Sequence, residues 1–299
     1  MTERNYPLIV DIKKDSHEDG PGIRSVVFFK GCLLRCIFCQ NIEAQESEAE
    51  IAFSIRKCIK CGKCEEVCQQ KAIDINFPGR IHRDRCIRCS ICVNFCPTGA
   101  LKIVGVYYPV DVLTKILLRY EPFYRHSGGG VTFSGGECTL YPDYLEILLK
   151  NLKIHGIHIV LETAGYFSYR SFAQKILPYV DFIYYDIKII DPEKHREYTG
   201  KSNDIILDNL NRLLKESRIE VHTRIPLIPG ITTSYDNLLG IAKFVREAGA
   251  SDISLLSYNP MGIGMAEKLG KPKPFLPESF MRPDEEESIY AMFRELIKE

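Results

Sequence analysis

The sequence lacks an excess of charge of either sign, since its 299 residues include 39 Lys and Arg and 39 Asp and Glu. This balance argues against a protein that binds nucleic acid or an anionic membrane mainly by charge. No apolar run approaches the roughly 20 residues of a membrane-spanning helix. The first residues also lack the charged, then apolar, then small pattern of a secretory signal. We therefore expect a cytoplasmic protein without nucleic-acid or membrane partners.

Cysteine, by contrast, is abundant and unevenly placed. Eleven of the 12 cysteines lie within residues 32–96, and only Cys138 lies outside. In a reducing compartment, clustered cysteines are more often metal or redox ligands than disulfides. The eleven form three groups by spacing: Cys32, Cys36 and Cys39; then Cys58, Cys61, Cys64 and Cys68; then Cys86, Cys89, Cys92 and Cys96.

The second and third groups share the spacing C-x-x-C-x-x-C-x-x-x-C. This is the run of bacterial ferredoxins, in which three cysteines bind one [4Fe-4S] cluster and the fourth binds the other. Structural zinc is the alternative, but it usually takes two separated pairs of ligands. The pattern predicts a ferredoxin-like α+β insert at residues 49–106 with two clusters. The predicted ligands are Cys58, Cys61, Cys64 and Cys96 for one cluster, and Cys86, Cys89, Cys92 and Cys68 for the other.

The first cysteine group, Cys32, Cys36 and Cys39, has the spacing C-x-x-x-C-x-x-C. It offers three ligands to a [4Fe-4S] cluster that needs four. One iron would then be open to another molecule, as in catalytic metal sites. Cys138 could complete the set, although a lone cysteine is more often a small buried apolar residue. The histidines form no cluster that would add a ligand set.

Outside the insert, short β-rich runs alternate with stretches of helical period. The predicted strands are 25–29, 131–133, 158–161, 182–186, 220–225 and 252–256, and the predicted helices are 110–118, 143–152, 169–177, 204–215, 235–247 and 283–297. This alternation indicates βαβ units and a parallel sheet. Six units are too few for a closed eight-stranded barrel, so an open partial barrel and a doubly wound sheet both fit the pattern.

Polar residues or glycines stand at or just beyond the end of every predicted strand. They are Gly31, Ser134, Glu162, Asp186, Arg224 and Tyr258. Parallel β/α barrels carry their chemistry at the carboxyl ends of the strands. This placement therefore favours the barrel, with a site at one end.

Several motifs extend over nearly the whole chain. They are D-G-P-G-I-R at 19–24, V-T-F-S-G-G-E at 131–137, E-T-A-G at 162–165, D-I-K at 186–188, Y-T-G at 198–200 and R-I-P-L-I-P-G at 224–230. With the cysteine loop, they resemble the glycyl radical enzyme activating enzymes of the radical S-adenosylmethionine superfamily. The resemblance implies an α/β fold, a partial (β/α)6 TIM-like barrel formed by residues 1–48 and 107–299 around the insert.

The resemblance also implies an oxidoreductase with three [4Fe-4S] clusters and S-adenosylmethionine. In the family, reductive cleavage of S-adenosylmethionine at the open cluster yields a 5′-deoxyadenosyl radical, which abstracts a hydrogen from a backbone glycine of a partner glycyl radical enzyme. The expected partners are such an enzyme and a reductant such as flavodoxin or ferredoxin, and the chain itself is expected to be a monomer. Two other functions stay open: a radical S-adenosylmethionine enzyme for another peptide or small molecule, and a non-enzymatic electron-transfer protein.

The resemblance assigns roles to individual residues. Lys188 joins the first cysteine group in the catalytic centre, as a partner for the methionyl carboxylate. The expected S-adenosylmethionine contacts are Phe38, Gln40, Asn41, Gly135, Gly136, Glu137, Asp186, Lys188, Arg224 and Asn259. A monovalent cation is suggested at Glu162, Thr163 and the carbonyl of Tyr184. Asn259 is a departure, because better-known members have a histidine there.

Overall fold

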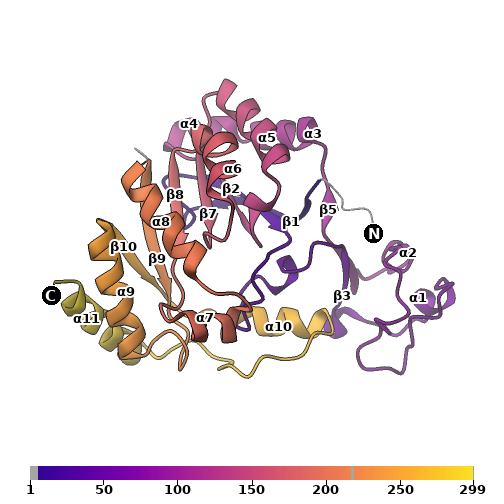
Figure 1. Cartoon of the computed structure of the whole chain (residues 1–299). Helices are drawn as coiled ribbons and strands as arrows, with labels where there is room; N and C mark the ends of the chain where they lie inside the picture. Colours follow the sequence, from indigo (N-terminus) through magenta and orange to yellow (C-terminus); the bar gives the residue numbers. More distant parts are fainter. Residues whose placement is uncertain (1–5, 217–218, 299) are drawn as a thin grey trace.

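Six parallel strands form the centre of the fold in the computed structural model, which describes residues 6–216 and 219–298. They are β2 (Arg24–Lys30), β6 (Gly130–Gly135), β7 (His158–Thr163), β8 (Phe182–Asp186), β9 (Glu220–Pro226) and β10 (Asp252–Leu256). Each pairs with the next in chain order. A doubly wound sheet would reverse this order near its middle. The structure therefore confirms the partial barrel, and all six predicted strands are present (Figure 1).

Two further strands extend the sheet beyond β2, and the sequence did not predict them. β1 (Leu8–Ser16) pairs antiparallel with β2, and β5 (Val106–Tyr107) pairs antiparallel with β1. β2 is buried along nearly its whole length, as expected of a strand covered on both faces. β1 has several exposed charged residues, so it lacks the continuous apolar run by which the inner strands are identified.

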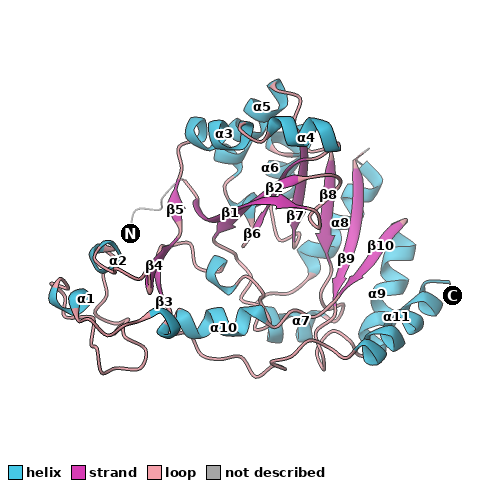
Figure 2. Cartoon of the chain, turned by 180° about the vertical axis from the view of Figure 1, so that it is seen from behind, coloured by secondary structure: helices cyan, strands magenta, loops and turns pink. Residues whose placement is uncertain are grey.

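Helices pack on the outside of the curved sheet (Figure 2). They are α3 (Val110–Leu118), α4 (Glu121–Ser127), α5 (Pro142–Ile154), α6 (Tyr169–Lys175), α8 (Asp204–Glu216), α9 (Tyr235–Ala248) and α11 (Pro283–Lys298). In α5, the buried residues are Tyr144, Leu145, Leu148, Leu149 and Leu152. This spacing places one apolar face against the sheet, so the main core lies between the sheet and the helices. No helix of the described residues is long and apolar enough to cross a membrane.

Two short helices at the edge where the parallel strands end, α7 (Pro192–Thr199) and α10 (Met261–Lys268), were not predicted. α7 begins after Asp191, whose carboxylate accepts hydrogen bonds from two backbone N–H groups of the first turn. It ends at Gly200, which has the left-handed φ of 78°. α10 follows β10 and packs against β3 (Glu50–Phe53) and the 3-10 helix η1 (Ile42–Ala44). The other 3-10 helices are η2 (Ile55–Lys57), η3 (Cys138–Leu140) and η4 (Leu177–Tyr179).

The cysteine-rich segment forms a separate lobe beside the barrel (Figures 1 and 2). Its two-stranded sheet pairs β3 (Glu50–Phe53) antiparallel with β4 (Leu101–Val104), and the short helices α1 (Lys63–Glu66) and α2 (Ile91–Asn94) lie between them in sequence. Its own apolar cluster is small and is surrounded largely by cysteines. The domain boundaries at 49 and 106 stay a prediction, and Val106 is part of β5 in the main sheet.

Candidate active site and cluster sites

The loop with the first cysteine group starts directly after β2, at the carboxyl edge of the sheet. Its backbone is held by the end of α7: Arg35 N–H donates to the carbonyl of Thr199 (2.7 Å), and Ile37 N–H donates to the carbonyl of Tyr198 (3.0 Å). The left-handed turn at Gly200 ends α7 and leaves these carbonyls free to accept. The Y-T-G motif therefore has a structural role here, which is to position the cysteine loop.

The three thiols of the first cysteine group are largely withdrawn from solvent. Burial raises the pKa of Cys32 to about 12, and burial also raises the pKa of Cys36 and Cys39. Without a metal these thiols would be protonated at neutral pH, so cluster binding must release protons. Among the described residues, no three His, Cys, Asp or Glu side chains converge tightly enough for a single metal ion.

A cavity of about 670 Å³ opens beside the first cysteine group. This volume suits a small-molecule ligand. The cavity brings together most of the residues expected at the site: Cys32, Cys36, Phe38, Cys39, Gln40, Asn41, Gly135, Gly136, Glu162, Thr163, Asp186, Lys188, Arg224 and Asn259. The polar lining residues without a role in the sequence analysis are Lys13, Glu18, Asp19, Gln45 and Ser257, of which only Asp19 lies in a quoted motif.

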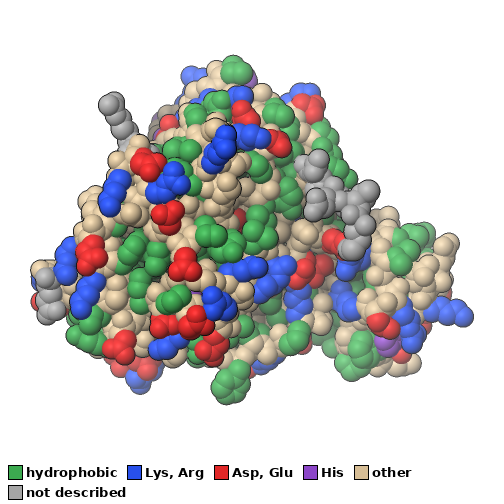
Figure 3. Space-filling view, in the orientation of Figure 1, with side chains coloured by type: hydrophobic (Ala, Val, Ile, Leu, Met, Phe, Trp, Pro, Cys, Tyr) green, Lys and Arg blue, Asp and Glu red, His purple; other side chains and the backbone are tan. Residues whose placement is uncertain are grey.

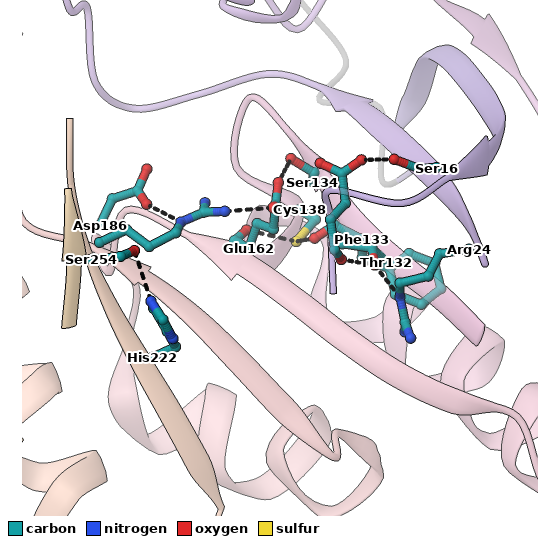
Figure 4. A network of polar contacts seen from close by, with 12 residues as sticks. Ser16, Arg24, Thr132, Phe133, Ser134, Cys138, Glu162, Asp186, His222 and Ser254 are labelled. Atoms are coloured by element: carbon teal, nitrogen blue, oxygen red, sulfur yellow. Dashed lines mark hydrogen bonds and ion pairs between the residues drawn. The ribbon is translucent and has the colours of Figure 1, made fainter. Parts of the chain in front are cut away.

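A network of charged side chains crosses the barrel at this edge (Figure 4). Arg224 donates from Nη1 to Glu162 (2.7 Å) and from Nε to Asp186 (2.9 Å). Lys188 donates to the other oxygen of Asp186 (3.0 Å), and Ser134 donates to the other oxygen of Glu162. The network therefore joins the ends of β6, β7, β8 and β9.

The charges of Asp186 and Lys188 follow from the shifts of their pKa values. Burial raises the pKa of Asp186, but Arg224 and Lys188 outweigh burial and lower it below its ordinary value. Burial lowers the pKa of Lys188, but Asp186 and Cys36 outweigh burial and raise this pKa above its ordinary value. Asp186 and Lys188 therefore both stay ionised at neutral pH, and Lys188 presents an ammonium group to the cavity.

The glycines of the G-G-E motif are required by the packing of the protein itself. Gly135 has a φ of 109°, and a Cβ there would lie 2.3 Å from the backbone of Phe29. A Cβ on Gly136 would lie 2.3 Å from the carbonyl oxygen of Gly31 and 2.5 Å from that of Ala44. Both glycines thus allow β6 to approach β2 and the cysteine loop. Both also line the cavity, so their backbone is open to a ligand.

Two of the expected site residues lie outside the cavity lining. The carboxylate of Glu137 is buried and accepts hydrogen bonds from Thr139, from Thr163 Oγ1 (2.9 Å) and from Ala164 N (3.1 Å). It therefore joins the ends of β6 and β7, and burial raises its pKa. Tyr184 lies under Arg224, whose guanidinium carbon is 4.5 Å from the ring centroid.

Cys138 lies apart from the other cysteines in the structure as well as in the sequence. It is fully buried in the main apolar core, and its thiol lies 3.7 Å from the carbonyl of Phe133. It does not line the cavity that contains the first cysteine group. Cys138 is therefore not placed as a fourth ligand.

The eight cysteines of the insert surround two separate hollows. One hollow is lined by the outer set, Cys58, Cys61, Cys64 and Cys96. The other is lined by the inner set, Cys68, Cys86, Cys89 and Cys92. Each set joins three cysteines of one group with the fourth of the other, as in bacterial ferredoxins. All these cysteines are free thiols.

The surroundings of the outer set also fit an iron–sulfur cluster. Arg80 lines the hollow, is 3% exposed, and donates from Nη2 to the thiol sulfur of Cys58 (3.3 Å). Its Nε–H has no hydrogen-bond partner among the described residues. A buried donor normally has an acceptor, so this group calls for one within the hollow. The sulfur atoms of a cluster would supply it.

Comparison with known proteins defines the class of this fold and site. The family model of the radical SAM superfamily matches residues 88–242, and that of the 4Fe-4S dicluster domain matches residues 57–100. The structure is similar to a radical SAM methyltransferase from Sphaerobacter thermophilus, with a TM-score of 0.55 at 11% identity, covering 97% of this chain and 74% of that one. This likeness supports the radical SAM fold.

Curated relatives narrow the class. The indoleacetate decarboxylase activating enzyme of Tractidigestivibacter scatoligenes is 38% identical, over 88% of this chain and 86% of its own. The choline trimethylamine-lyase activating enzyme of Oleidesulfovibrio alaskensis is 37% identical, over 90% and 89%. The trans-4-hydroxy-L-proline dehydratase activating enzyme of Clostridioides difficile is 37% identical, over 96% of both chains. This chain belongs to the glycyl radical enzyme activating enzymes.

Proposed function

We propose that the first cysteine group binds an open [4Fe-4S] cluster, that S-adenosylmethionine occupies the cavity beside it, and that the product is a glycyl radical on a partner enzyme. The observation that carries this proposal is the meeting of three cysteines, a cavity of about 670 Å³ and a cationic lysine at one barrel edge. When bound, the cofactor and cluster supply a 5′-deoxyadenosyl radical, whereas the protein supplies binding, orientation and exclusion of water.

Different residues of the cavity would bind different parts of S-adenosylmethionine. Lys188, fixed by Asp186, would bind the methionyl carboxylate through its ammonium group. The exposed backbone of Gly135 and Gly136 would accept the amino group. Arg224 is already shared between two carboxylates, so it would mainly position Asp186 and leave that carboxylate able to accept from the ribose.

The nucleoside end would lie against the cysteine loop and the end of β10. Phe38, between two cysteines of the loop, offers a ring for the adenine, and Gln40 and Asn41 follow it on the cavity wall. The side-chain oxygen Oδ1 of Asn259 accepts a hydrogen bond from the backbone N–H of Met261 (3.0 Å). The side-chain NH2 group of Asn259 can then donate to the nucleoside. Unlike a histidine, this side chain stays neutral, and binding there should not depend on pH.

We propose three clusters in all, one each on the first cysteine group, the outer set and the inner set. An anaerobically reconstituted chain is therefore expected to contain about twelve irons, three cubes of four. Iron and sulfide analysis measures this directly. About four irons would contradict the assignment of clusters to the insert. A Cys89→Ala variant should lose about a third of the iron and keep cleavage of S-adenosylmethionine by dithionite.

The activity itself is tested with two cysteine variants. Reduction of the loaded protein with S-adenosylmethionine should yield 5′-deoxyadenosine, and Cys36→Ala should abolish it because the open cluster then lacks a ligand. Cys138→Ala is the matched control. Because Cys138 is buried outside the cavity, this variant should still cleave S-adenosylmethionine. Equal cleavage by Cys36→Ala and the unaltered chain would contradict the proposal.

The partner is tested by electron paramagnetic resonance. The relatives activate indoleacetate decarboxylase, choline trimethylamine-lyase and trans-4-hydroxy-L-proline dehydratase, so glycyl radical enzymes of these kinds are the first candidates. A glycyl radical signal on one candidate, dependent on S-adenosylmethionine, identifies the partner. Cleavage of S-adenosylmethionine without a glycyl radical on any candidate would favour a radical enzyme that acts on another peptide or small molecule.

A monovalent cation would bind at Glu162, Thr163 and the Tyr184 carbonyl only in competition with Arg224. Arg224 already neutralises Glu162, and a cation there would compete with the guanidinium for the same carboxylate. Thr163 Oγ1 also donates to Glu137, although its oxygen can still accept. We therefore expect weak binding, which titration of the activity with K⁺ and Na⁺ measures.

A further inference from the structure

The insert is a basic segment in a neutral chain. Residues 49–106 contain ten Lys and Arg and five Asp and Glu, so the remainder of the chain carries the matching acidic excess. Lys, Arg and apolar side chains are visible together on the insert, at the right of Figure 3. Such a separation of charge favours an acidic partner for the insert, through complementary potentials.

The positive charge concentrates beside the outer set. Arg56, Lys57, Lys60 and Lys63 fall within eight residues around Cys58 and Cys61, and all four are exposed. None of the four forms an ion pair with any carboxylate of the described residues. Their charge is therefore available to an approaching molecule.

Apolar side chains stand among these cations. Ile55 is 63% exposed, Ile59 is 65% exposed, and Phe95, which lines the outer hollow, is 54% exposed. The thiol ligand Cys61 is itself exposed. An apolar centre with a charged rim is the usual anatomy of a protein interface, and electron-transfer complexes use small ones. We name this surface the outer face; it consists of Ile55, Arg56, Lys57, Ile59, Lys60, Cys61, Lys63 and Phe95.

The surroundings of the inner set differ, although Ile87 and Cys89 are exposed there as well. Arg85 forms an ion pair with Asp84, and Arg88 forms one with Glu48. These two cations are thus paired locally. Lys71, three residues after Cys68, is exposed and forms no ion pair with a described residue, so the inner set has one such cation where the outer face has four. The charge complementarity that would orient a donor exists at the outer set.

The two-stranded β3–β4 sheet orders the two sets relative to the barrel. Glu50, at the start of β3, accepts from the buried Lys30 of β2 (2.7 Å) and so lies at the barrel. Ile51 lines the inner hollow, and Phe53, two residues further along the strand, lines the outer hollow. At about 3.3 Å per residue, the outer hollow begins roughly 7 Å farther from the barrel. Both Figures 1 and 2 accordingly draw α1, which carries Cys64, beyond α2, which carries Cys92.

Helix α10 lies between the inner set and the catalytic loop. At its end, the carbonyl of Lys268 accepts from Arg83, three residues before Cys86. At its start, Gly262 packs against the carbonyl oxygen of Cys39. The order in space is therefore outer set, inner set, then first cysteine group.

We infer that the outer face is the docking site of a small acidic protein that donates single electrons, and that these electrons enter the chain at the outer set. The inference rests on the proposed function for its three clusters. Buried Arg80, next to Cys58, adds a positive charge that favours the more negative, reduced state of a cluster at the outer set.

The test measures cluster reduction alone, without S-adenosylmethionine or a glycyl radical enzyme. The loaded, oxidised chain is mixed anaerobically with a reduced acidic flavodoxin, and bleaching of the clusters is followed by stopped-flow absorbance. A triple variant, Lys57→Glu, Lys60→Glu and Lys63→Glu, should be reduced about tenfold more slowly or worse at low salt. The unaltered chain should slow as salt is raised, since exposed charges are screened.

Two controls keep docking separate from damage to a cluster. Lys215→Glu, Lys243→Glu and Arg246→Glu reverse the same number of exposed cations on α8 and α9, and this variant should be reduced at the normal rate. The methyl viologen radical cation should reduce the first variant undiminished. The inference would be overturned if flavodoxin reduced the Lys57, Lys60 and Lys63 variant at the normal rate. It would also be overturned if viologen reduced this variant as slowly as flavodoxin does. Failure to form a glycyl radical would leave these rates unchanged, so it tests only the proposed function.

Discussion

Replacing Gly262 by Ala is expected to lower cleavage of S-adenosylmethionine about a hundredfold, the effect of displacing a catalytic group by about 1 Å. A Cβ at this position would lie 2.3 Å from the carbonyl oxygen of Cys39 and 3.1 Å from that of Gln40. Both are backbone atoms, so no side-chain rotation relieves the clash. Either α10 or the cysteine loop must move, and the loop carries the third ligand of the open cluster.

The measurement is the rate of 5′-deoxyadenosine formation, together with iron content. The insert clusters should remain, because their ligands lie elsewhere in the chain. Gly264→Ala is the matched control: it lies two residues further along the same helix, and a Cβ there would meet nothing within 4 Å. It should keep full activity and stabilise α10 by about 1 kcal/mol through helix propensity. Similar activities in the two variants would contradict the contact between α10 and the loop.

The sequence could not reveal α10. Two glycines within eight residues oppose helix formation, and tertiary contacts, such as those with η1 and β3, compensate for them. Gly262 therefore carries a functional contact that no local pattern indicates. β1 escaped prediction for another reason, because its exposed charged residues interrupt the apolar pattern. Its outer partner β5 is also distant in sequence and only two residues long.

The strand ends were predictable, because topology alone brings them together. Ser134, Glu162, Asp186 and Arg224 come from four different strands, and the structure joins them in one network. A motif does not, however, specify the direction of each side chain. Glu137 follows Gly136 in the G-G-E motif, yet its carboxylate is turned toward Thr139 and Thr163 and away from the cavity.

The same network yields the second large effect, from Arg224→Met. Arg224 is the only partner shared by Glu162 and Asp186 within the part of the chain that the structure describes. Its removal leaves Glu162 without a cation and Asp186 with Lys188 alone. Breaking a buried pair in this way costs about 3–5 kcal/mol, because the remaining charge stays desolvated. Urea unfolding under anaerobic conditions measures the loss.

The loss should depend on pH, and the sign follows from Asp186. In the unaltered chain, the pKa of Asp186 is lower in the folded state than its unfolded value of about 3.9. The ionised carboxylate therefore stabilises the fold above that value, and this stabilisation is lost as pH falls through the folded pKa. Without Arg224, burial is opposed by less positive charge, and the pKa of Asp186 rises. The variant should therefore be penalised most at neutral pH, and its stability deficit relative to the unaltered chain should narrow as pH falls through the raised pKa of Asp186.

Two variants separate this effect from a general loss of charge. Arg196→Met removes an exposed arginine that pairs with Glu193 on α7, and it should change stability by less than about 0.5 kcal/mol at every pH. Arg224→Lys keeps the charge but cannot bridge two carboxylates with a planar fork, so it should recover only part of the stability. A pH-independent deficit in Arg224→Met would show that lost packing, rather than the unpaired carboxylates, accounts for the change.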